Sequence, residues 1–355
     1  MTAEFRARYT IDRYFKRGMF LINYDQLWEI LTNHLSLAGQ QLSVNQFLER
    51  PFSVILNLKA ASDDRQSYFV KLYKIVDLQK QRLNIKKEFS ISRHWFEKFK
   101  ADAHFQVIEP VWLDEQNLII VTRKSPGINL LKLTDQLRFF PSRTSVRQVL
   151  DFLFRAGQWL NKFQSFPIDE KVPYLEEAVH LTLDYLQNYL LIRMQKMVKN
   201  PHLDFDQQLQ EKILAFLQNQ WQQADQDCKR LTFTHTDFSL SNVLVSQQKI
   251  TVLDFGKCEI NSPYKDLARF YHQLYLLGFK PSFQNNNVRK MQTAFLQGYG
   301  DPQADKCPLF KIFFMIHQVT HLGKISRFWE RGPVENFYNR FLVKRVLKDL
   351  KATVL

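Results

Sequence analysis

The spacing of hydrophobic residues changes along the chain, and the change predicts two kinds of structure. Residues 25–37 repeat Leu and Ile at helical spacing, which predicts a helix. Short segments with strand character follow, separated by polar turn residues; they cover residues 41–47, 52–60, 67–73, 105–112 and 118–122. A basic helical stretch over residues 78–99 interrupts them. The first third of the chain is therefore predicted to form an antiparallel sheet with accompanying helices.

The pattern becomes mainly helical after Ser125-Pro126-Gly127, which interrupts the strand pattern. Helices are expected over residues 145–166, 174–198 and 205–223, and again from Tyr264 to the C-terminus. Short strands and a polar loop are expected over residues 231–253. We predict an α+β fold with a small β-rich lobe, residues 1–122, and a larger helical lobe, residues 123–355.

Composition narrows the class of protein. The 355 residues are 45% hydrophobic and 24% charged, as in ordinary globular proteins, and they are too many for one simple core. No segment approaches the roughly 18 apolar residues that a membrane span requires. The first 20 residues lack the apolar centre of a signal peptide.

The formal net charge is +14, which favours anionic ligands such as nucleotides, phosphorylated substrates, anionic lipid surfaces or nucleic acid. A solubility charge spread over the whole surface would explain it equally well. No recognised nucleic-acid-binding motif is present, so we expect no nucleic acid partner. Contact with a membrane surface stays open.

The three cysteines, Cys228, Cys258 and Cys307, are far apart in the sequence. This sparse, odd set argues against a disulfide framework and against a structural zinc site. The simplest compartment is therefore a reducing cytoplasm.

The candidate chemistry lies in two neighbouring segments. Residues 234–245 read as a loop feeding a strand, and residues 250–256 as a strand that ends in Asp254-Phe255-Gly256. A turn over residues 246–249 would fold them into a hairpin and bring Asp237, Asn242 and Asp254 together. Asp237 could accept the proton of an attacking hydroxyl. Asn242 and Asp254 offer the oxygen ligands that Mg²⁺ prefers.

These motifs resemble those of a known group. His235-x-Asp237-x-x-x-x-Asn242 followed by Asp-Phe-Gly is similar to the catalytic motifs of kinase-fold enzymes. The downstream Asp266-Leu267-Ala268 is similar to the aminoglycoside phosphotransferase and choline kinase-like superfamily. The resemblance implies a bilobal protein-kinase-like fold that binds ATP and Mg²⁺ between its lobes. It also implies that Asp266 buttresses the catalytic loop, and His235 is expected to support that loop.

The resemblance extends to the β-rich lobe. It implies a strand lysine that contacts the nucleotide phosphates, for which Lys71 is the candidate and Lys74, at the strand's end, the weaker one. Glu88 on the following helix would pair with it. The segment 118–122, ending at Thr122, would be the hinge whose backbone holds adenine. The chain departs from the family pattern at Thr236, where glycine is usual, and in the phosphate loop over residues 48–53, which contains no glycine.

The leading hypothesis is a phosphotransferase that uses the hydroxyl of a small molecule or glycan as acceptor. Between Asp254 and Asp266 there is no room for the activation segment and Ala-Pro-Glu signature of a protein kinase, so that alternative is weaker. A non-catalytic, kinase-like nucleotide-binding module is the other alternative. The acceptor could be anionic or lipid-linked; its identity, the choice of ATP or GTP, and the oligomeric state stay open.

Overall fold

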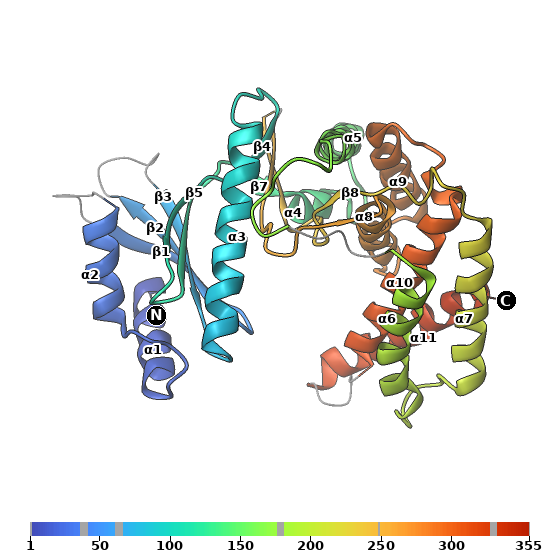
Figure 1. The fold of residues 1–355 in the computed structure, drawn as a ribbon, viewed down its shortest axis with the longest axis horizontal. Helices are drawn as coiled ribbons and strands as arrows, with labels where there is room; N and C mark the ends of the chain where they lie inside the picture. Colours follow the sequence, from blue (N-terminus) through green and yellow to red (C-terminus); the bar gives the residue numbers. More distant parts are fainter. Residues whose placement is uncertain are drawn as a thin grey trace. The chain divides into compact units, whose positions relative to one another are not determined.

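The computed structural model describes residues 2–35, 42–60, 67–175, 181–247, 249–326 and 332–354. The chain divides into two compact units, which are described separately. Unit 1 takes in residues 1–127, 172–174 and 244–257, and unit 2 takes in residues 128–171, 175–243 and 258–355. Unit 1 is built on an antiparallel sheet and unit 2 is mainly helical, which confirms the predicted α+β class (Figure 1).

Unit 1 contains a five-stranded antiparallel sheet in the order β1-β2-β3-β6-β5. Its strands are β1 (Leu42–Glu49), β2 (Ser53–Ala60), β3 (Ser67–Tyr73), β5 (Pro110–Asp114) and β6 (Ile119–Arg123). Successive side chains point to opposite faces of a strand. In β3, Val70 and Leu72 are fully buried in the larger core of the unit, while Lys71 between them points to the other face.

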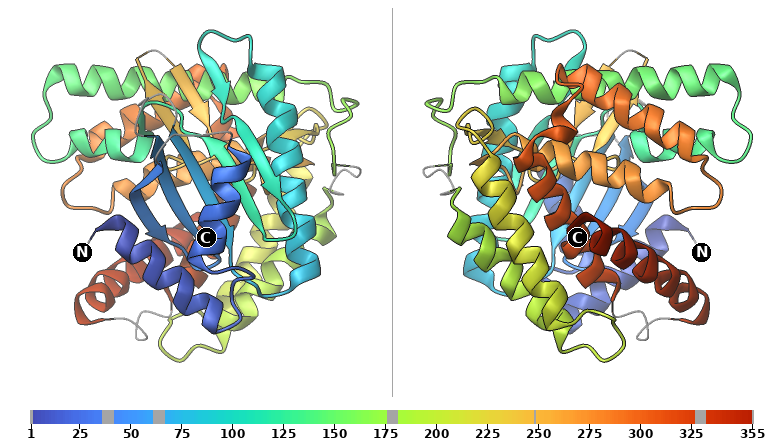
Figure 2. Two further views of the ribbon diagram at one scale, coloured as in Figure 1. Left: turned by 90° about the vertical axis from the view of Figure 1, so that its left-hand side faces the viewer. Right: turned by 90° about the vertical axis from the view of Figure 1, so that its right-hand side faces the viewer.

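Helices lie on both faces of this sheet. α1 (Ala3–Lys16) and α2 (Tyr24–His34) lie on one face, where Figure 2 shows them as the blue helices in front of the strands in its left view. α3 (Leu78–Phe99) lies on the other face, where Ile85 packs with Ile120. Asn23 starts α2 with a capping box, and the Asp77 side chain accepts a hydrogen bond from Lys80 N at the start of α3. The α3 bounds match the predicted helix.

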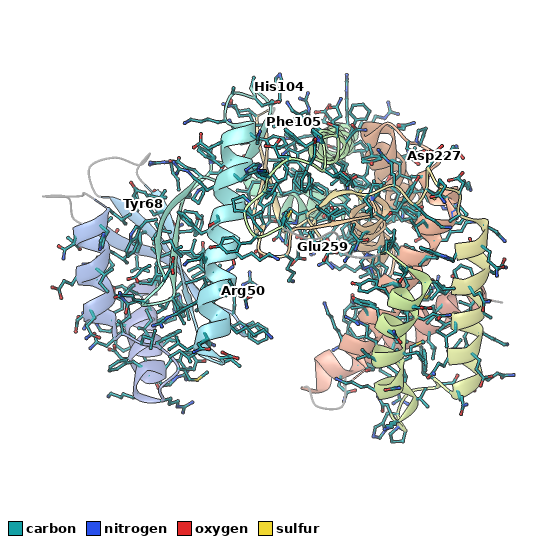
Figure 3. The ribbon with its side chains drawn as sticks, in the orientation of Figure 1. Arg50, Tyr68, His104, Phe105, Asp227 and Glu259 are labelled. Atoms are coloured by element: carbon teal, nitrogen blue, oxygen red, sulfur yellow. The ribbon has the colours of Figure 1, made fainter. Side chains whose placement is uncertain are left out.

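The predicted strand over residues 105–112 is two strands, so that prediction is wrong. β4 (Phe105–Val107) pairs in parallel with β10 (Lys249–Val252), and β5 pairs antiparallel with β6. The chain passes from one sheet to the other at Pro110, the first residue of β5. Proline has no backbone N–H to donate and is tolerated at the first position of a strand. Figure 3 labels His104 and Phe105, where β4 begins. β9 (Val243–Ser246) lies next to β10, which confirms the predicted hairpin.

Unit 2 consists mainly of helices. They are α4 (Leu130–Thr134), α5 (Arg143–Gln164), α6 (Leu183–Val198), α7 (Gln207–Gln223), α8 (Tyr264–Leu277), α9 (Asn285–Tyr299), α10 (Pro308–Ile325) and α11 (Pro333–Val354), with one turn of 3₁₀-helix at Asp135–Leu137 and another at Ala304–Lys306. Among the described helices, none is both long and apolar enough to span a bilayer. Besides the two-residue β7 (Ile128–Asn129), β8 (Thr232–Thr234) pairs with β11 (Glu259–Asn261).

The helix expected over residues 174–198 starts later than predicted, at Leu183. Tyr174 has a φ of 61°, which lies outside the helical region. The Thr182 side chain accepts a hydrogen bond from Tyr185 N and so forms the N-cap. Leu175, Leu181 and Thr182 therefore belong to the connection, and residues 176–180 lie outside the described part of the chain.

Cys228 and Cys307, remote in the sequence, meet in unit 2. Their Sγ atoms are 2.9 Å apart and both residues are free thiols. Cys228 follows α7, and Cys307 is the N-cap residue of α10. Sequence spacing could not predict this contact, because it depends on how these helices pack.

α5 and α9 pack closely because glycines occupy the contact. A Cβ atom at Gly298 would overlap the backbone carbonyl of Phe154, and one at Gly157 would overlap that of Phe295. Large aromatic side chains fill the core beside this contact; they are Trp159, Phe163, Phe238, Phe270 and Phe295.

Gly298→Ala is expected to lower the free energy of unfolding by about 3 kcal/mol, because two helix backbones must separate. Alanine alone would favour the helix by about 1 kcal/mol, so a net loss isolates the packing cost. Chemical denaturation of both proteins measures it. Gly323→Ala on α10 is the matched control, since its nearest neighbour would be Met197 Sδ at 3.9 Å. Equal effects of the two substitutions would contradict the argument.

Candidate active site

A cluster of polar side chains in unit 1, the Lys71 cluster, joins Lys71, Tyr73, Glu88 and Asp254. Lys71 Nζ lies 2.9 Å from Glu88 Oε1 and 4.0 Å from Asp254 Oδ1. The Tyr73 hydroxyl donates a hydrogen bond to Glu88 Oε2, and burial raises the pKa of Tyr73 well above its ordinary value. Tyr73 therefore stays a neutral donor that fixes Glu88 beside the lysine.

The local sequence explains why these groups meet. Strand alternation turns Lys71 toward α3, and Glu88 lies on α3 three residues after Ile85, so both share the face that packs on the sheet. A Cβ at Gly256 would lie 3.0 Å from Glu88 Oε2, so glycine permits this close approach. Asp254 has a φ of 67°, an uncommon conformation for a residue other than glycine that is concentrated at functional sites.

Lys74, the weaker lysine candidate, has a different environment. Its Nζ lies 3.2 Å from Glu49 Oε1 and 4.2 Å from the centre of the Tyr14 ring. The hydrogen bond from the Tyr14 hydroxyl, and then the one from Lys74, lower the pKa of Glu49 despite its burial. Lys74 is thus committed to the contact between α1 and the sheet, whereas Lys71 faces Glu88 and Asp254.

Thr122, the candidate hinge residue, lies in β6 opposite Phe69 of β3. The next two N–H groups are engaged within unit 1: Arg123 N donates to Glu109 O at 2.9 Å and Lys124 N to Ser67 O at 2.8 Å. Those two donors are therefore not available to a nucleotide base.

A second cluster, in unit 2, forms around Asp266 near the start of α8. The Asp266 carboxylate is fully buried and accepts hydrogen bonds from His235 N at 2.7 Å and from Thr236 N at 2.8 Å. His235 is also buried, and its Nδ1 lies 3.3 Å from Asp237 N. Thr236, which stands where glycine is usual, has a φ of 57°. The two hydrogen bonds to Asp266 hold this strained backbone in place.

Asp237 and Asn242 belong to the same loop. Asn242 Nδ2 donates to Asp237 O at 3.0 Å, which fixes the amide and its oxygen. Asp237 also forms an ion pair with Arg269 Nη2, and both side chains are mostly buried. The sequence analysis did not identify Arg269. The sequence could have indicated it, because Arg269 lies three residues after Asp266 and residues three apart share a helix face.

Titration of Asp266 should be visible in activity. Burial raises the pKa of Asp266 to about 6, while the N–H donors of His235 and Thr236 act against the shift. Above pH 6 the carboxylate is ionised and holds the loop through charge-assisted hydrogen bonds. We expect kcat/KM to fall about tenfold per pH unit below pH 6.

Protonation of Asp266 is expected to lower activity but to stabilise the folded state. A folded pKa raised above the ordinary 3.8 gives stability that is full below pH 3.8 and lost as the pH rises through 6. A loss of activity on protonation of Asp266 is therefore not caused by unfolding. Circular dichroism at each pH should show that the protein stays folded while its activity falls. Asp266→Asn should lower activity roughly 10- to 100-fold and remove this acid limb. An unchanged acid limb in that variant would contradict the assignment.

Each unit contains an oxygen donor of the kind that magnesium prefers. Mg²⁺ prefers oxygen ligands and is commonly held by one or two carboxylates together with substrate phosphates. Asp254 offers a carboxylate that is 43% exposed, and Asn242 offers an amide oxygen while its Nδ2 is engaged. Among the described residues, no group of three or more His, Cys, Asp or Glu side chains could hold a metal by itself. A protein-only cage is therefore not what these residues form.

The structure thus brings the predicted residues together in two sets. Unit 1 unites Lys71, Glu88 and Asp254, and unit 2 unites His235, Asp237, Asn242 and Asp266. Thr122 lies in β6 opposite Phe69 and is not one of the four residues of the Lys71 cluster.

Comparison with known proteins gives a family match and many structural neighbours. The model of the phosphotransferase enzyme family, APH, matches residues 57–306. No curated protein sequence matches the chain. The fold resembles APH(2'')-IIa in a ternary complex with streptomycin and ATP, with 15% identity, coverage of 92% of this chain and 97% of that one, and a TM-score of 0.58.

Two further similar structures are of enzymes named for other substrates. Choline kinase from Cryptosporidium parvum Iowa II is 14% identical, with 94% and 98% coverage and a TM-score of 0.57. Macrolide 2'-phosphotransferase MphH from Brachybacterium faecium is 15% identical, with 90% and 97% coverage and a TM-score of 0.53. At these identities the likeness concerns the fold, and it confirms the predicted kinase-like fold and family resemblance.

Proposed function

Because the chain belongs to the phosphotransferase enzyme family, we propose that it transfers the γ-phosphoryl group of ATP to a hydroxyl of a small molecule or glycan. The observation that carries this proposal is the Lys71 cluster. A strand lysine 2.9 Å from a helix glutamate and 4.0 Å from an aspartate is what kinase-type phosphoryl transfer requires to hold nucleotide phosphates and metal.

We assign roles in unit 1 from those contacts. Lys71 binds the phosphate oxygens, and Glu88 holds Lys71 in position, itself held by Tyr73. Asp254 is the proposed carboxylate ligand of Mg²⁺, which supplies positive charge to the transferring phosphoryl group when bound. The Thr122 segment remains the proposed contact for adenine, through groups other than the Arg123 and Lys124 N–H donors.

The roles in unit 2 concern the acceptor. Asp237 orients the acceptor hydroxyl and accepts its proton, and Arg269 keeps the carboxylate in one orientation. Asn242 supplies the second proposed oxygen ligand to magnesium. His235 and Asp266 support the loop through buried hydrogen bonds and do not take part in the chemistry.

The acceptor is the least defined part of the proposal. The structural neighbours include complexes with streptomycin, gentamicin and kanamycin, and one neighbour is a choline kinase. The net charge of +14 favours an anionic or lipid-linked acceptor for this chain. If charge recruits the acceptor, its KM should rise with salt, and a salt-independent KM would argue against this class. The sparse, free cysteines support a cytoplasmic location.

A label-transfer screen tests the function directly. Radiolabelled ATP and GTP are offered separately with panels of aminoglycosides, macrolides, choline-like amines, sugars and glycolipids. The expected result is a labelled phosphoester from ATP that Asp237→Ala does not form. Labelling of polypeptides alone would indicate a protein kinase instead. Nucleotide binding without any labelled product would indicate a binding module.

A further inference from the structure

α1 presents aromatic side chains to solvent on the face that is turned away from the sheet. Phe5 and Tyr9 lie one helical turn apart and are 54% and 59% exposed. The opposite face of the same helix is buried, through Ala7, Ile11 and Tyr14. At 3.6 residues per turn, Phe5 and Tyr9 point away from that buried face. The fold of unit 1 therefore does not use these two rings.

Cationic side chains lie next to the two rings and further along the same helix. Arg6, Lys16 and Arg17 are exposed and form no ion pair with any described residue. Arg13 continues the row begun by Phe5 and Tyr9 and is 4.0 Å from Glu49 at its nearest. We call these six residues, Phe5, Arg6, Tyr9, Arg13, Lys16 and Arg17, the α1 outer face.

Two acidic residues, Glu4 and Asp12, lie on the same helix, and Glu4 is exposed in its first turn. Asp12 accepts a hydrogen bond from Tyr24 N at 2.9 Å, which ties its carboxylate to the start of α2. Arg8 pairs with Asp25 at 2.9 Å. α1 and its C-cap residue Arg17 carry five cationic side chains against these two carboxylates, so the net charge of the helix is positive.

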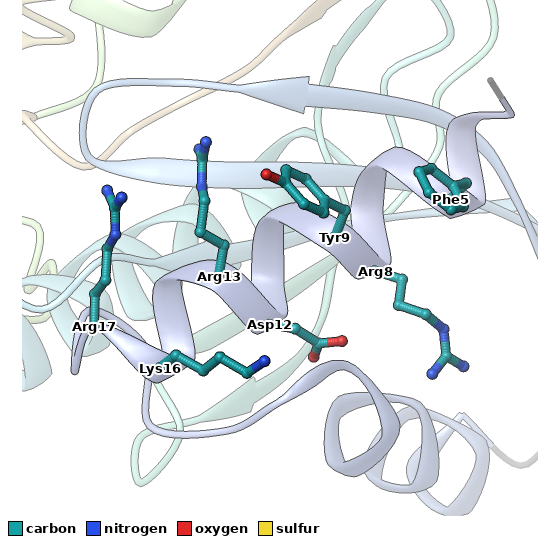
Figure 4. A pocket seen from close by; sticks show the side chains of 7 residues that line it. All are labelled: Phe5, Arg8, Tyr9, Asp12, Arg13, Lys16 and Arg17. Carbon is teal, nitrogen blue, oxygen red and sulfur yellow. The ribbon is translucent and has the colours of Figure 1, made fainter.

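Figure 4 shows how these side chains spread over the helix. Tyr9, Arg13 and Arg17 extend to one side of the helix axis, and Arg8, Asp12 and Lys16 extend to the other. Together with Phe5 they line an open depression of about 530 Å³. The lining is long, follows one helix, and combines apolar rings with flexible cations.

We propose that the α1 outer face binds the anionic headgroup region of a phospholipid bilayer. A helix with apolar rings at the centre of its free face and cations beside them can lie in the plane of a membrane interface. Aromatic rings prefer the headgroup level, and each Lys or Arg near an anionic surface adds binding free energy. Single-stranded nucleic acid would instead require a basic groove that follows the strand, and the depression here follows one helix.

The inference goes beyond the phosphotransferase proposal and can be tested without nucleotide. The full chain is sedimented with vesicles of phosphatidylcholine alone and with vesicles that also contain phosphatidylglycerol. We expect binding to the mixed vesicles that weakens as salt rises, and little binding to phosphatidylcholine alone. Absence of binding to both vesicle types would overturn the proposal.

Charge-reversal variants test the site. R6E/K16E/R17E should weaken binding to the mixed vesicles by about 100-fold or more, since each cation is worth roughly fivefold. K80E/K290E/K348E is the matched control, because it makes the same change in net charge at exposed lysines of α3, α9 and α11. Equal losses in the two triple variants would show that overall charge, and not α1, recruits the protein, and would overturn the inference.

An aromatic variant separates lipid binding from simple attraction to polyanions. F5S/Y9S should weaken vesicle binding by about tenfold while leaving binding to heparin unchanged, because the rings insert among headgroups. Both residues are exposed, so the variant should keep the parent's thermal midpoint. Vesicle binding that is unaffected by F5S/Y9S, or tighter binding to heparin or oligonucleotides than to vesicles, would overturn the assignment of a bilayer as partner.

Discussion

Asp237→Asn is expected to lower kcat by about 10³-fold while leaving the Kd for ATP near that of the parent. The substitution removes the carboxylate that accepts the acceptor's proton, and a positioned general base contributes about 10²- to 10⁴-fold. It also removes the charge that pairs with Arg269, so the loop loses an ion pair on that side. Nucleotide binding should survive because the Lys71 cluster is untouched.

The measurement is steady-state label transfer with the acceptor from the screen, together with calorimetric binding of the nucleotide. Asp227→Asn is the matched control, since Asp227 is an exposed aspartate of unit 2, labelled in Figure 3, outside the Asp266 cluster. The control should keep full activity. An Asp237→Asn protein that transfers phosphate at the parent's rate would remove Asp237 from the mechanism.

Asp254→Asn should have an effect of similar size through the metal. Losing the carboxylate weakens the hold on Mg²⁺, and a bound metal supplies several kcal/mol of charge stabilisation, so we expect about 10³-fold lower kcat/KM. The defect should shrink as magnesium rises, which distinguishes weakened metal binding from a damaged fold. Lys71 Nζ, 4.0 Å away, also loses its neighbouring charge.

Activity is measured across a magnesium titration at saturating nucleotide. Glu115→Gln provides the comparison within unit 1, because Glu115 pairs with Lys86 on the surface at 2.9 Å, away from the Lys71 cluster. That variant should follow the parent's magnesium dependence. If Asp254→Asn also followed it, the metal role would have to be assigned to another residue.

The elements predicted best are those whose signal is local. The expected α3 helix is right at both ends because Asp77 caps it and hydrophobic spacing continues to Phe99. β3 is right at both ends because alternation in Ser67–Tyr73 matches a strand with one buried face. The same alternation turned Lys71 toward Glu88, so their contact followed from strand and helix periodicity together.

Two of the failures depend on partners that are remote in the sequence. β4 separates from β5 because β4 pairs with β10, and local alternation in residues 105–112 carries no sign of that partner. The contact between Asp237 and Arg269 depends on how α8 is placed. α1 was not predicted, and its exposed aromatic residues show why: Phe5 and Tyr9 obscure the apolar stripe that periodicity would otherwise reveal.

The neighbouring thiols of Cys228 and Cys307 have a topological consequence. Seventy-nine positions separate them, and His235, Asp237, Asn242, Asp254, Asp266 and Arg269 all lie between them. Oxidation by a disulfide reagent would turn this stretch into a covalent ring that a single backbone cut could not split into two pieces. Closing a ring of this size removes about 4–5 kcal/mol of unfolded-state entropy on the chain-entropy account. These six residues would then lie within a closed ring of polypeptide whose covalent link is at the start of α10.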